Sequence, residues 1–415
     1  MRFATRLSPA VDDRLRAHVQ KVWLAPDGDE SPVAVSLRTP PPGHTVVEEY
    51  AVLPHPRMAR FLVPLASPRL AAATFLEYNA IRSPLSRAVR LALAGGFALG
   101  LTRVVQRHRL LVSVDRRVPR SDWTRLLVTR HLAEVLGRQE LHAFVALRQV
   151  NPNAKPTLEM FDEFAAPAGY AKLGTTEATK ELVRTAAATI GELDGGGGRL
   201  LVPRLLAAGD WNETAYAIVE PLPRGVRRWT GGVQATISSM RAVAATGVVS
   251  LSPYAGSSYA ARLRGELAAI DGQSEVTPML WSWLRRLEQS PAPILFGRSH
   301  GDWIPDNVGR CGDRLAAWDW EHSNPDAPVG FDLLHWHFHH TLVAKDLAAA
   351  VAAVYAATPQ LELLDVAEST RRTVARAYLL DLFVRRTRLA AGGGGWNHRW
   401  YPALLEVLRH RSTRA

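Results

Sequence analysis

A short stretch near residue 300 carries carboxylate and amide side chains at spacings that suit phosphoryl transfer. Asp302 is followed five residues later by Asn307, and Asp319 comes seventeen residues after Asp302, at the end of the apolar run 315–318. Transfer of a phosphoryl group from a nucleotide needs a carboxylate that orients or deprotonates the acceptor hydroxyl, and oxygen ligands that hold Mg²⁺ against the phosphates. A loop with Asp302 and Asn307, backed by an aspartate at a strand end, predicts these parts.

The tripeptide His300-Gly301-Asp302 alone is more typical of a turn than of a catalytic site, because such residues are common in turns. Asn307 at the required offset and Asp319 at the required distance make the joint pattern specific. We therefore interpret the block as a phosphotransferase site, with Asp302 and His300 as its candidate catalytic residues.

The run His300-Gly-Asp-x-x-x-x-Asn307, followed by Asp319-Trp-Glu321, resembles the catalytic core of the aminoglycoside phosphotransferase and choline kinase-like families. The resemblance implies an α+β, bilobal protein-kinase-like fold with a small antiparallel-sheet lobe and a helical lobe. It also implies an ATP- and Mg²⁺-dependent enzyme in which Asp302 is the catalytic aspartate and Asn307 and Asp319 are magnesium ligands.

The same resemblance implies roles for two further acidic residues. Glu321 matches a frequent acidic partner two residues after the metal aspartate, and we include it with the metal ligands. Asp332 resembles the buried aspartate that braces the catalytic loop, which is a structural role. The likeness covers residues 122–415.

The segment before this block has the order of a small antiparallel lobe with one helix. We expect three strands, then a helix, then two strands, in the ranges 141–148, 157–164, 169–173, 176–193, 200–207 and 215–220. Alternation of this kind, with turn residues between the runs, predicts one sheet covered by one helix.

Lys172 lies on the third of these runs, in a chain whose basic residues are almost all arginines. A kinase-like lobe needs a cation from its third strand at the nucleotide phosphates, and a compact ammonium fits that position. We predict this contact for Lys172; the alternative is an exposed basic residue at a strand end.

The glutamate that normally pairs with this lysine is missing from the following helix. Ala186 lies where the glutamate is expected, and Glu181 lies five residues earlier, about 140° around the helix. Glu181 could take over only with a helix rotation or a register shift. The alternative to an active kinase is therefore a catalytically weak or inactive kinase-like protein that binds nucleotide or acts as a scaffold.

The resemblance also implies where the nucleotide lies. Backbone groups near Glu220 and Leu222, after the fifth strand, are expected to bind the adenine. The loop that covers the phosphates is expected at 149–156, and it contains no glycine.

Residues 1–121 carry no chemical motif, and we expect them to form an additional N-terminal α/β domain of unknown role. The nucleotide-binding lobe then spans 122–222 and the helical lobe spans 223–415. A helical pattern covers about 69–106. Its most apolar part, 91–101, has about 11 residues and is too short to span a bilayer, so we predict no transmembrane segment.

The overall composition is that of a folded protein, with 47% hydrophobic and 21% charged residues and a net charge of +11. Basic residues are spread over all segments without a recognition motif, so we expect no nucleic-acid partner. The single cysteine, Cys311, excludes an intrachain disulfide, and no signal peptide is readable, so we expect a cytoplasmic protein.

The acceptor is expected to be a small hydroxylated molecule bound by the helical lobe. Residues 223–299 contain nine arginines and four acidic residues, which favours a neutral or anionic acceptor, such as a sugar or a cell-envelope intermediate. Trp303, inside the candidate loop, is the tryptophan to test first for stacking on the acceptor; the alternative is packing, the usual role of aromatic residues near strand and helix cores. The histidines at 335, 337, 339 and 340 are interpreted as packing and surface groups, not as a metal site.

Overall fold

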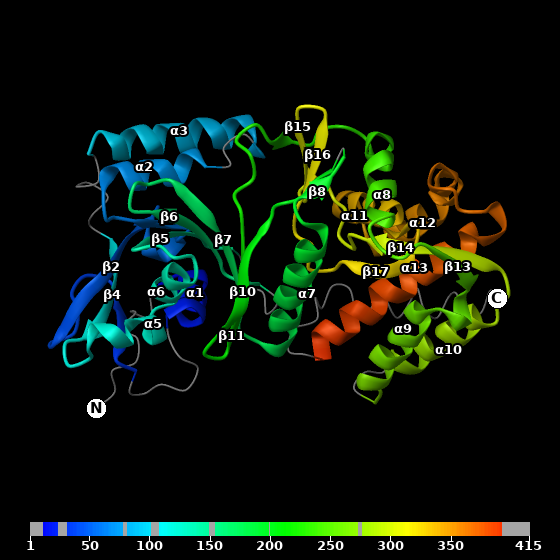
Figure 1. Ribbon diagram of the computed structural model, residues 1–415, viewed down its shortest axis with the longest axis horizontal. Helices are drawn as coiled ribbons and strands as arrows, with labels where there is room; N and C mark the ends of the chain where they lie inside the picture. Colours follow the sequence, from blue (N-terminus) through cyan, green and yellow to red (C-terminus); the bar gives the residue numbers. More distant parts are fainter. Residues whose placement is uncertain are drawn as a thin grey trace. The chain divides into compact units, whose positions relative to one another are not determined.

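The computed structural model describes residues 11–23, 31–77, 81–100, 108–148, 154–198, 200–272 and 276–391 (Figure 1). Most of the predicted phosphate-covering loop, 149–153, lies outside these residues. The chain divides into two compact units. The first comprises Met1–Ala187 and Pro203–Val226, and the second comprises Ala188–Val202 and Arg227–Ala415.

The first unit is built on a nine-stranded antiparallel sheet, in the order β1-β4-β2-β3-β5-β6-β7-β11-β10. Its strands are β1 Val33–Ser36, β2 His44–Leu53, β3 Phe61–Pro64, β4 Arg109–Asp115, β5 Leu141–Ala146, β6 Thr157–Asp162, β7 Pro167–Gly174, β10 Leu205–Trp211 and β11 Thr214–Val219. Its helices are α1 Asp13–Trp23, η1 Pro56–Met58, α2 Pro68–Leu76, α3 Pro84–Ala98, η3 Arg120–Asp122, α5 Trp123–Leu126, α6 Val128–Val135 and most of α7 Glu177–Leu193.

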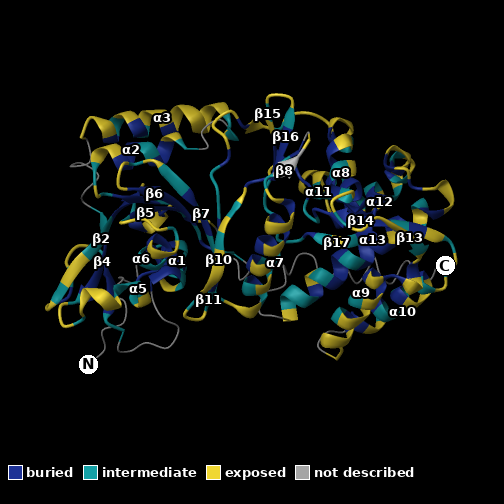
Figure 2. Cartoon of the chain, in the orientation of Figure 1, coloured by how far each residue is buried: buried dark blue, intermediate teal, exposed yellow. Residues whose placement is uncertain are grey.

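Helices cover both faces of this sheet (Figure 1). Buried residues of α1 and α6 pack on the face that carries Leu158 and Ala171. The α2–α3 pair packs on the opposite face through aromatic side chains that include Phe75 and Phe144. Figure 2 shows β5 and β6 as largely buried and the outer surface of α3 as exposed.

The strands of 1–121 belong to the same sheet as the strands of the predicted nucleotide-binding lobe. β3 pairs with β5, with Phe61 opposite Ala146 and Leu62 opposite Val145. Leu15 of α1 lies in the same core cluster as Leu158 of β6. A separate N-terminal domain with a boundary near residue 121 is therefore not what the structure shows, because backbone hydrogen bonds and a shared core join the two segments.

The five predicted strands and the helix of that lobe are observed, with one change. The run 200–207 is divided at Pro203 into β9 Leu200–Leu201 in the second unit and β10 in the first. Proline has no backbone N–H to donate to a ladder, so it disfavours a continuous strand through this position.

The second unit combines two small sheets with helices. One sheet has the order β12-β15-β16-β9-β8 and the other the order β13-β14-β17. The further strands are β8 Gly196–Gly197, β12 Arg227–Arg228, β13 Ser250–Pro253, β14 Pro293–Ser299, β15 Val308–Cys311, β16 Arg314–Ala317 and β17 Asn324–Pro328. The helices are η4 Val233–Thr236, α8 Ile237–Ala244, η5 Tyr254–Gly256, α9 Ser258–Ala269, α10 Thr277–Glu288, α11 Phe331–Ala344, α12 Leu347–Ala356, η6 Thr358–Leu364 and α13 Glu368–Leu389.

None of the described helices is, by itself, long and apolar enough to cross a bilayer. Within the same described residues, α12 and η6 together reach the required length and hydropathy, but they form a pair bent by 52°.

Candidate active site

The loop 300–307 connects β14 to β15 and carries the predicted catalytic aspartate. It turns at Gly301, which has φ +79°. A Cβ at this position would lie 1.9 Å from the backbone oxygen of His322. The conformation and the close approach both require glycine, so the sequence His-Gly-Asp is a structural requirement of this turn.

Asp332, in the first turn of α11, holds the backbone of this loop. Its carboxylate accepts hydrogen bonds from the N–H groups of His300, at 2.8 Å, and Gly301, at 2.9 Å. Burial raises the pKa of Asp332. Both hydrogen bonds are made to a side chain that is 6% exposed, so they are shielded from competition by water.

Both carboxylate oxygens of Asp302 have protein partners. Oδ1 lies 2.9 Å from Nε2 of His335, and Oδ2 accepts from Nδ2 of Asn307 at 2.8 Å. Burial opposes the ionisation of Asp302, but the hydrogen bond from His335 and the nearby His322 and Arg385 outweigh it, so the pKa of Asp302 lies well below its usual range. The carboxylate is therefore ionised and held in one orientation.

The hydrogen bonds of Asn307 fix the direction of its amide. Nδ2 also donates to the backbone oxygen of Asp302, at 3.0 Å. With the NH₂ group directed to two acceptors on Asp302, the amide oxygen is the atom left to coordinate a cation. Asn307 is buried, so this orientation is protected from solvent.

The β15–β16 hairpin brings Asp319 back to the loop. The Trp318 N–H donates to the Asn307 backbone oxygen at 3.1 Å, and the Trp318 oxygen lies 3.0 Å from Nε2 of His300. Asp319 follows directly and has φ +75°, a conformation that costs a non-glycine residue roughly 1 kcal/mol or more. Such strain is common at functional sites.

These residues fit a Mg²⁺ ion that is shared with a phosphate ligand. Within the described part of the chain, no group of three or more His, Cys, Asp or Glu side chains could hold a metal by itself. Mg²⁺ commonly takes only one or two protein oxygens and completes its shell with phosphates and water. Asn307 and Asp319 would supply those oxygens, and the Glu321 carboxylate lies 3.8 Å from His322 nearby in the chain.

The candidate catalytic residue His300 and the candidate stacking residue Trp303 are both buried. His300 is fully buried: Nδ1 accepts from the Asp302 N–H at 3.3 Å, and its ring packs on Trp303 and Trp320. Trp303 is also fully buried and donates from Nε1 to Thr236 at 3.3 Å. This geometry is that of residues that shape the loop, because neither ring has surface left for a substrate or an acceptor.

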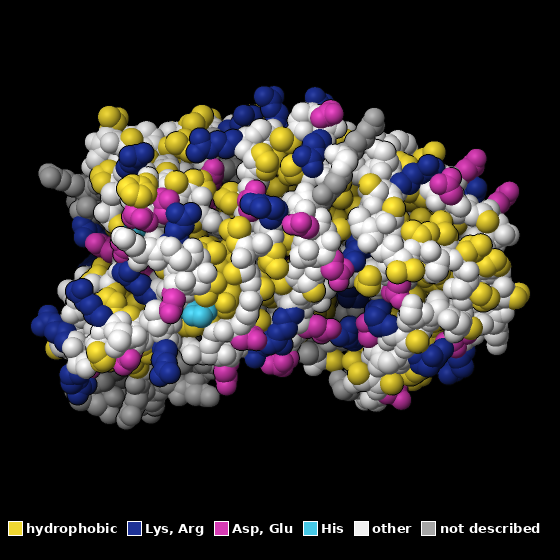
Figure 3. Space-filling model, viewed as in Figure 1, with side chains coloured by type: hydrophobic (Ala, Val, Ile, Leu, Met, Phe, Trp, Pro, Cys, Tyr) yellow, Lys and Arg dark blue, Asp and Glu magenta, His cyan; other side chains and the backbone are white. Residues whose placement is uncertain are grey.

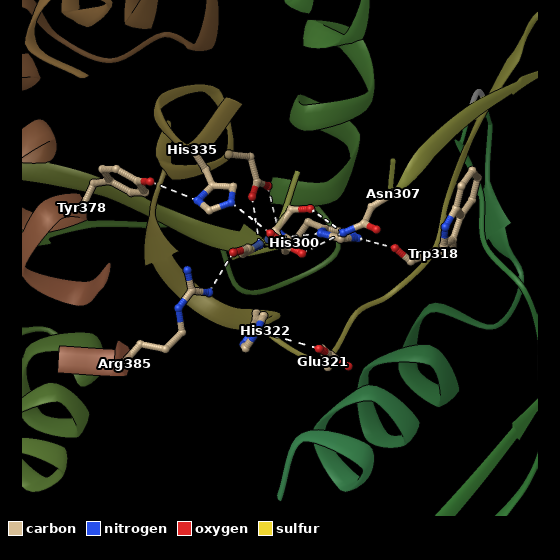
Figure 4. Close-up of polar contacts among 11 residues, drawn as sticks. His300, Asn307, Trp318, Glu321, His322, His335, Tyr378 and Arg385 are labelled. Carbon is tan, nitrogen blue, oxygen red and sulfur yellow. Dashed lines mark hydrogen bonds and ion pairs between the residues drawn. The ribbon is translucent and has the colours of Figure 1, made fainter. Parts of the chain in front are cut away.

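His335 and Tyr378 are the site residues that the sequence interpretation missed. Figure 4 shows His335 between Tyr378 and the catalytic loop. Nδ1 of His335 lies 3.0 Å from the Tyr378 hydroxyl, and both residues are buried. A usable signal was present, because His335 lies three residues after Asp332 and therefore on the same face of α11.

The predicted nucleotide contacts lie in the first unit. Lys172 on β7 is opposite Ala217, which packs against Val183 and Ala187 of α7, so Lys172 is on the face of the sheet that α7 covers. On that helix Ala186 is buried and Glu181 is exposed.

The segment after β11 carries the predicted adenine contacts. The Glu220 N–H donates to the Arg204 backbone oxygen at 2.9 Å, and its carboxylate pairs with the Arg204 guanidinium at 2.6 Å. Leu222 is buried.

Comparisons with known proteins found structural likeness only. No family model and no curated protein sequence matches the chain. Among solved structures, the chain is similar to a thermostable mutant of aminoglycoside phosphotransferase APH(4)-Ia, with 12% identity, 68% of this chain and 99% of that chain covered, and a TM-score of 0.38.

Two further solved structures are similar at the same level. The gentamicin–APH(2")-IIa complex has 10% identity, 69% and 95% coverage, and a TM-score of 0.41. Amicoumacin kinase hAmiN in complex with AMP-PNP, Ca²⁺ and Ami has 12% identity, 64% and 86% coverage, and a TM-score of 0.38. TM-scores below 0.5 assign no role to any residue of this chain.

Proposed function

We propose that this protein is an ATP- and Mg²⁺-dependent phosphotransferase that phosphorylates a hydroxyl group of a small molecule. One observation carries the proposal. A loop braced by Asp332 presents an ionised Asp302 and an Asn307 whose amide oxygen is directed away from it, and the β15–β16 hairpin returns Asp319 to that loop.

Asp302 orients the acceptor hydroxyl in this proposal. The hydroxyl oxygen bonds to the γ-phosphorus of the nucleotide as the bond from that phosphorus to the β,γ-bridging oxygen breaks, ADP leaves, and the hydroxyl proton passes to Asp302. Phosphoryl transfer has a loose transition state that demands little from a base, so a carboxylate of low pKa serves mainly to position the acceptor.

Asn307 and Asp319 hold Mg²⁺ in the same proposal, with Glu321 as a further acidic group. The ion supplies neutralisation of phosphate charge. Lys172 contacts the phosphates, and backbone groups near Glu220 and Leu222 contact the adenine.

The acceptor proposed is a neutral, sugar-like or cell-envelope-related molecule. The arginine excess in 223–299 is a weaker guide than the sequence suggested. Among the described residues, at least five of its nine arginines are ion-paired, in the pairs Arg228–Asp306, Arg241–Asp365, Arg262–Glu266, Arg264–Glu288 and Arg298–Glu192. Figure 3 likewise shows basic and acidic side chains interspersed on the visible surface.

A catalytically weak or inactive nucleotide-binding protein is the second candidate. The buried Ala186 on α7 favours it, because this helix offers the sheet no carboxylate at the expected position. Glu181, five residues earlier on the same helix, is exposed.

Asp302→Asn tests the proposal. We expect the natural chain, supplied with Mg²⁺ and either ATP or GTP, to phosphorylate at least one member of a sugar and envelope-precursor panel. Asp302→Asn is expected to lower kcat by about 100-fold or more, with nucleotide-induced thermal stabilisation retained. Asp306→Asn is the matched control, because its side chain lies in the same loop and is 75% exposed. Equal activity of natural chain and Asp302→Asn contradicts the proposal, and binding without turnover supports the second candidate.

A further inference from the structure

We propose that His335 is a positioning residue for Asp302, and that Tyr378 sets the tautomer in which His335 acts. This inference rests on the proposed function, since it concerns how the catalytic carboxylate is oriented. It assigns a task to one member of the histidine cluster in α11, which the phosphotransferase motif does not include.

Helix α11 contacts both the backbone of the catalytic loop and the side chain of Asp302. Asp332 accepts from the loop backbone, and His335, one turn further along α11, reaches the side chain of Asp302. Residues three apart lie on the same helix face, so a displacement of α11 moves both contacts together. The backbone of the loop and its reactive carboxylate are thus aligned by a single rigid element.

The proton on the His335 ring is located by its two partners. A carboxylate oxygen can only accept, so Nε2 of His335 must carry the hydrogen of the 2.9 Å contact with Oδ1 of Asp302. Burial lowers the pKa of His335, and a neutral ring with Nε2–H has an acceptor at Nδ1. The Tyr378 hydroxyl, 3.0 Å away, donates to it.

Tyr378 is suited to that single role. Burial raises the pKa of Tyr378 well above its usual value, so the hydroxyl remains protonated and remains a donor. It comes from α13, and its ring packs on Phe331 and Phe338 of α11. The chain Tyr378–His335–Asp302 therefore has one direction of donation, from the tyrosine to the carboxylate.

The consequence for Asp302 is a fixed carboxylate plane. His335 holds Oδ1 while Asn307 holds Oδ2, so rotation about the Cβ–Cγ bond breaks at least one hydrogen bond. Each carboxylate oxygen has a second lone pair, which leaves an acceptor direction for a substrate hydroxyl. Loss of His335 frees one oxygen and lets the carboxylate rotate, which lowers the fraction of complexes in a reactive geometry.

Three substitutions of His335 test the inference, because they differ in whether the new side chain can reach Asp302 with a hydrogen-bond donor. His335→Gln places an amide NH₂ close to the position of Nε2 and can still donate to Asp302, whereas His335→Asn is too short and His335→Ala has no donor. We expect kcat to fall about 10- to 100-fold in the Asn and Ala variants and to recover to within a few-fold of the natural value in Gln, with the KM values for nucleotide and acceptor unchanged.

The control is His337→Ala. His337 lies on the same helix and is partly buried, but its Nε2 lies 3.1 Å from Oε1 of Gln360. We expect natural kcat in this variant.

Tyr378→Phe in the natural chain tests the inference even if a His335 variant folds poorly. It is expected to lower kcat several-fold in the natural chain and to have no further effect in His335→Gln, where no ring tautomer remains to be set. In ¹⁵N NMR spectra, the natural His335 ring is expected to show the Nε2–H tautomer, and Tyr378→Phe is expected to reduce its population.

The outcomes separate this inference from the proposed function. Activity that survives in Asp302→Asn overturns the proposed function itself. Two results overturn the positioning role alone, provided that Asp302→Asn is inactive. One is a natural kcat in His335→Ala, and the other is an equal loss of kcat in His335→Gln and His335→Asn. A change confined to KM also overturns it, because a positioning residue acts after the substrates are bound.

Discussion

Glu159 is an acidic side chain in surroundings that disfavour its charge. It lies on β6 with 7% of its surface exposed, and its Oε2 accepts no hydrogen bond. Burial raises the pKa of Glu159 to about 7, against the opposing effect of Arg90. The folded state therefore retains a proton on this carboxyl that the unfolded chain releases at lower pH.

Glu159→Gln is expected to remove a pH dependence of stability. Because the folded pKa is raised, the stability associated with the protonated carboxyl is complete below about pH 4.5 and is lost as the pH rises through about 7. Between pH 5 and 8 the natural chain should lose up to about 3 kcal/mol of unfolding free energy relative to Glu159→Gln. Denaturant titrations of both chains at the two pH values measure this, and parallel pH profiles would show that Glu159 has an ordinary pKa.

At the scale of the element, the conformation of the catalytic loop requires glycine at position 301. Gly301 combines a positive φ with a Cβ position 1.9 Å from the backbone oxygen of His322. Gly312, in the turn of the β15–β16 hairpin, also has a positive φ, of +63°, but no atom lies within 4 Å of its Cβ position. Substitution of these two glycines therefore distinguishes the cost of backbone strain from the cost of a steric clash.

Gly301→Ala is expected to cost both stability and activity. The β-carbon must displace the backbone that follows Asp319, so we expect a kcat loss of 10-fold or more and a destabilisation of several kcal/mol. Gly312→Ala is expected to cost about 1 kcal/mol from strain alone, with natural kcat. Thermal unfolding and initial-rate measurements on both variants test this expectation. Equal losses of stability and kcat in the two variants would refute the steric argument.

The nine-stranded sheet makes the first unit a single cooperative body at the scale of the molecule. Residues 1–121 contribute β1 to β4 and the helices α1, α2 and α3. Their side chains form the same core clusters as residues from β5 to β7. Without them, the edge of β5 that faces β3 would be open to water, as would the parts of the two apolar faces that α1, α2 and α3 cover.

Removal of residues 1–121 is therefore expected to abolish folding of the remaining chain. We expect the truncated chain to be aggregated or to lack a cooperative thermal transition, whereas the full chain unfolds cooperatively. Calorimetry and size-exclusion chromatography of the two chains provide the measurement. A soluble 122–415 chain with its own sharp transition would restore the separate N-terminal domain that the sequence suggested.

The sequence by itself determined the candidate loop and most strands of the predicted nucleotide-binding lobe. Asp302, Asn307 and Asp319 lie within eighteen residues of chain, so one turn and one hairpin are enough to bring them together. Alternating apolar patterns mark strands locally, and five such strands are observed where expected, apart from the division at Pro203.

Only the tertiary structure decided what supports that loop and which strands are neighbours. Tyr378 is 43 residues from His335, and the paired residues of β3 and β5 are 83 and 85 positions apart in the chain. A periodic pattern states that a residue is buried but not against what, because any apolar partner satisfies the hydrophobic effect equally. Hydrogen-bonded neighbours such as His335 and Asp302 are specified by geometry, and geometry exists only once the helices and sheets have packed.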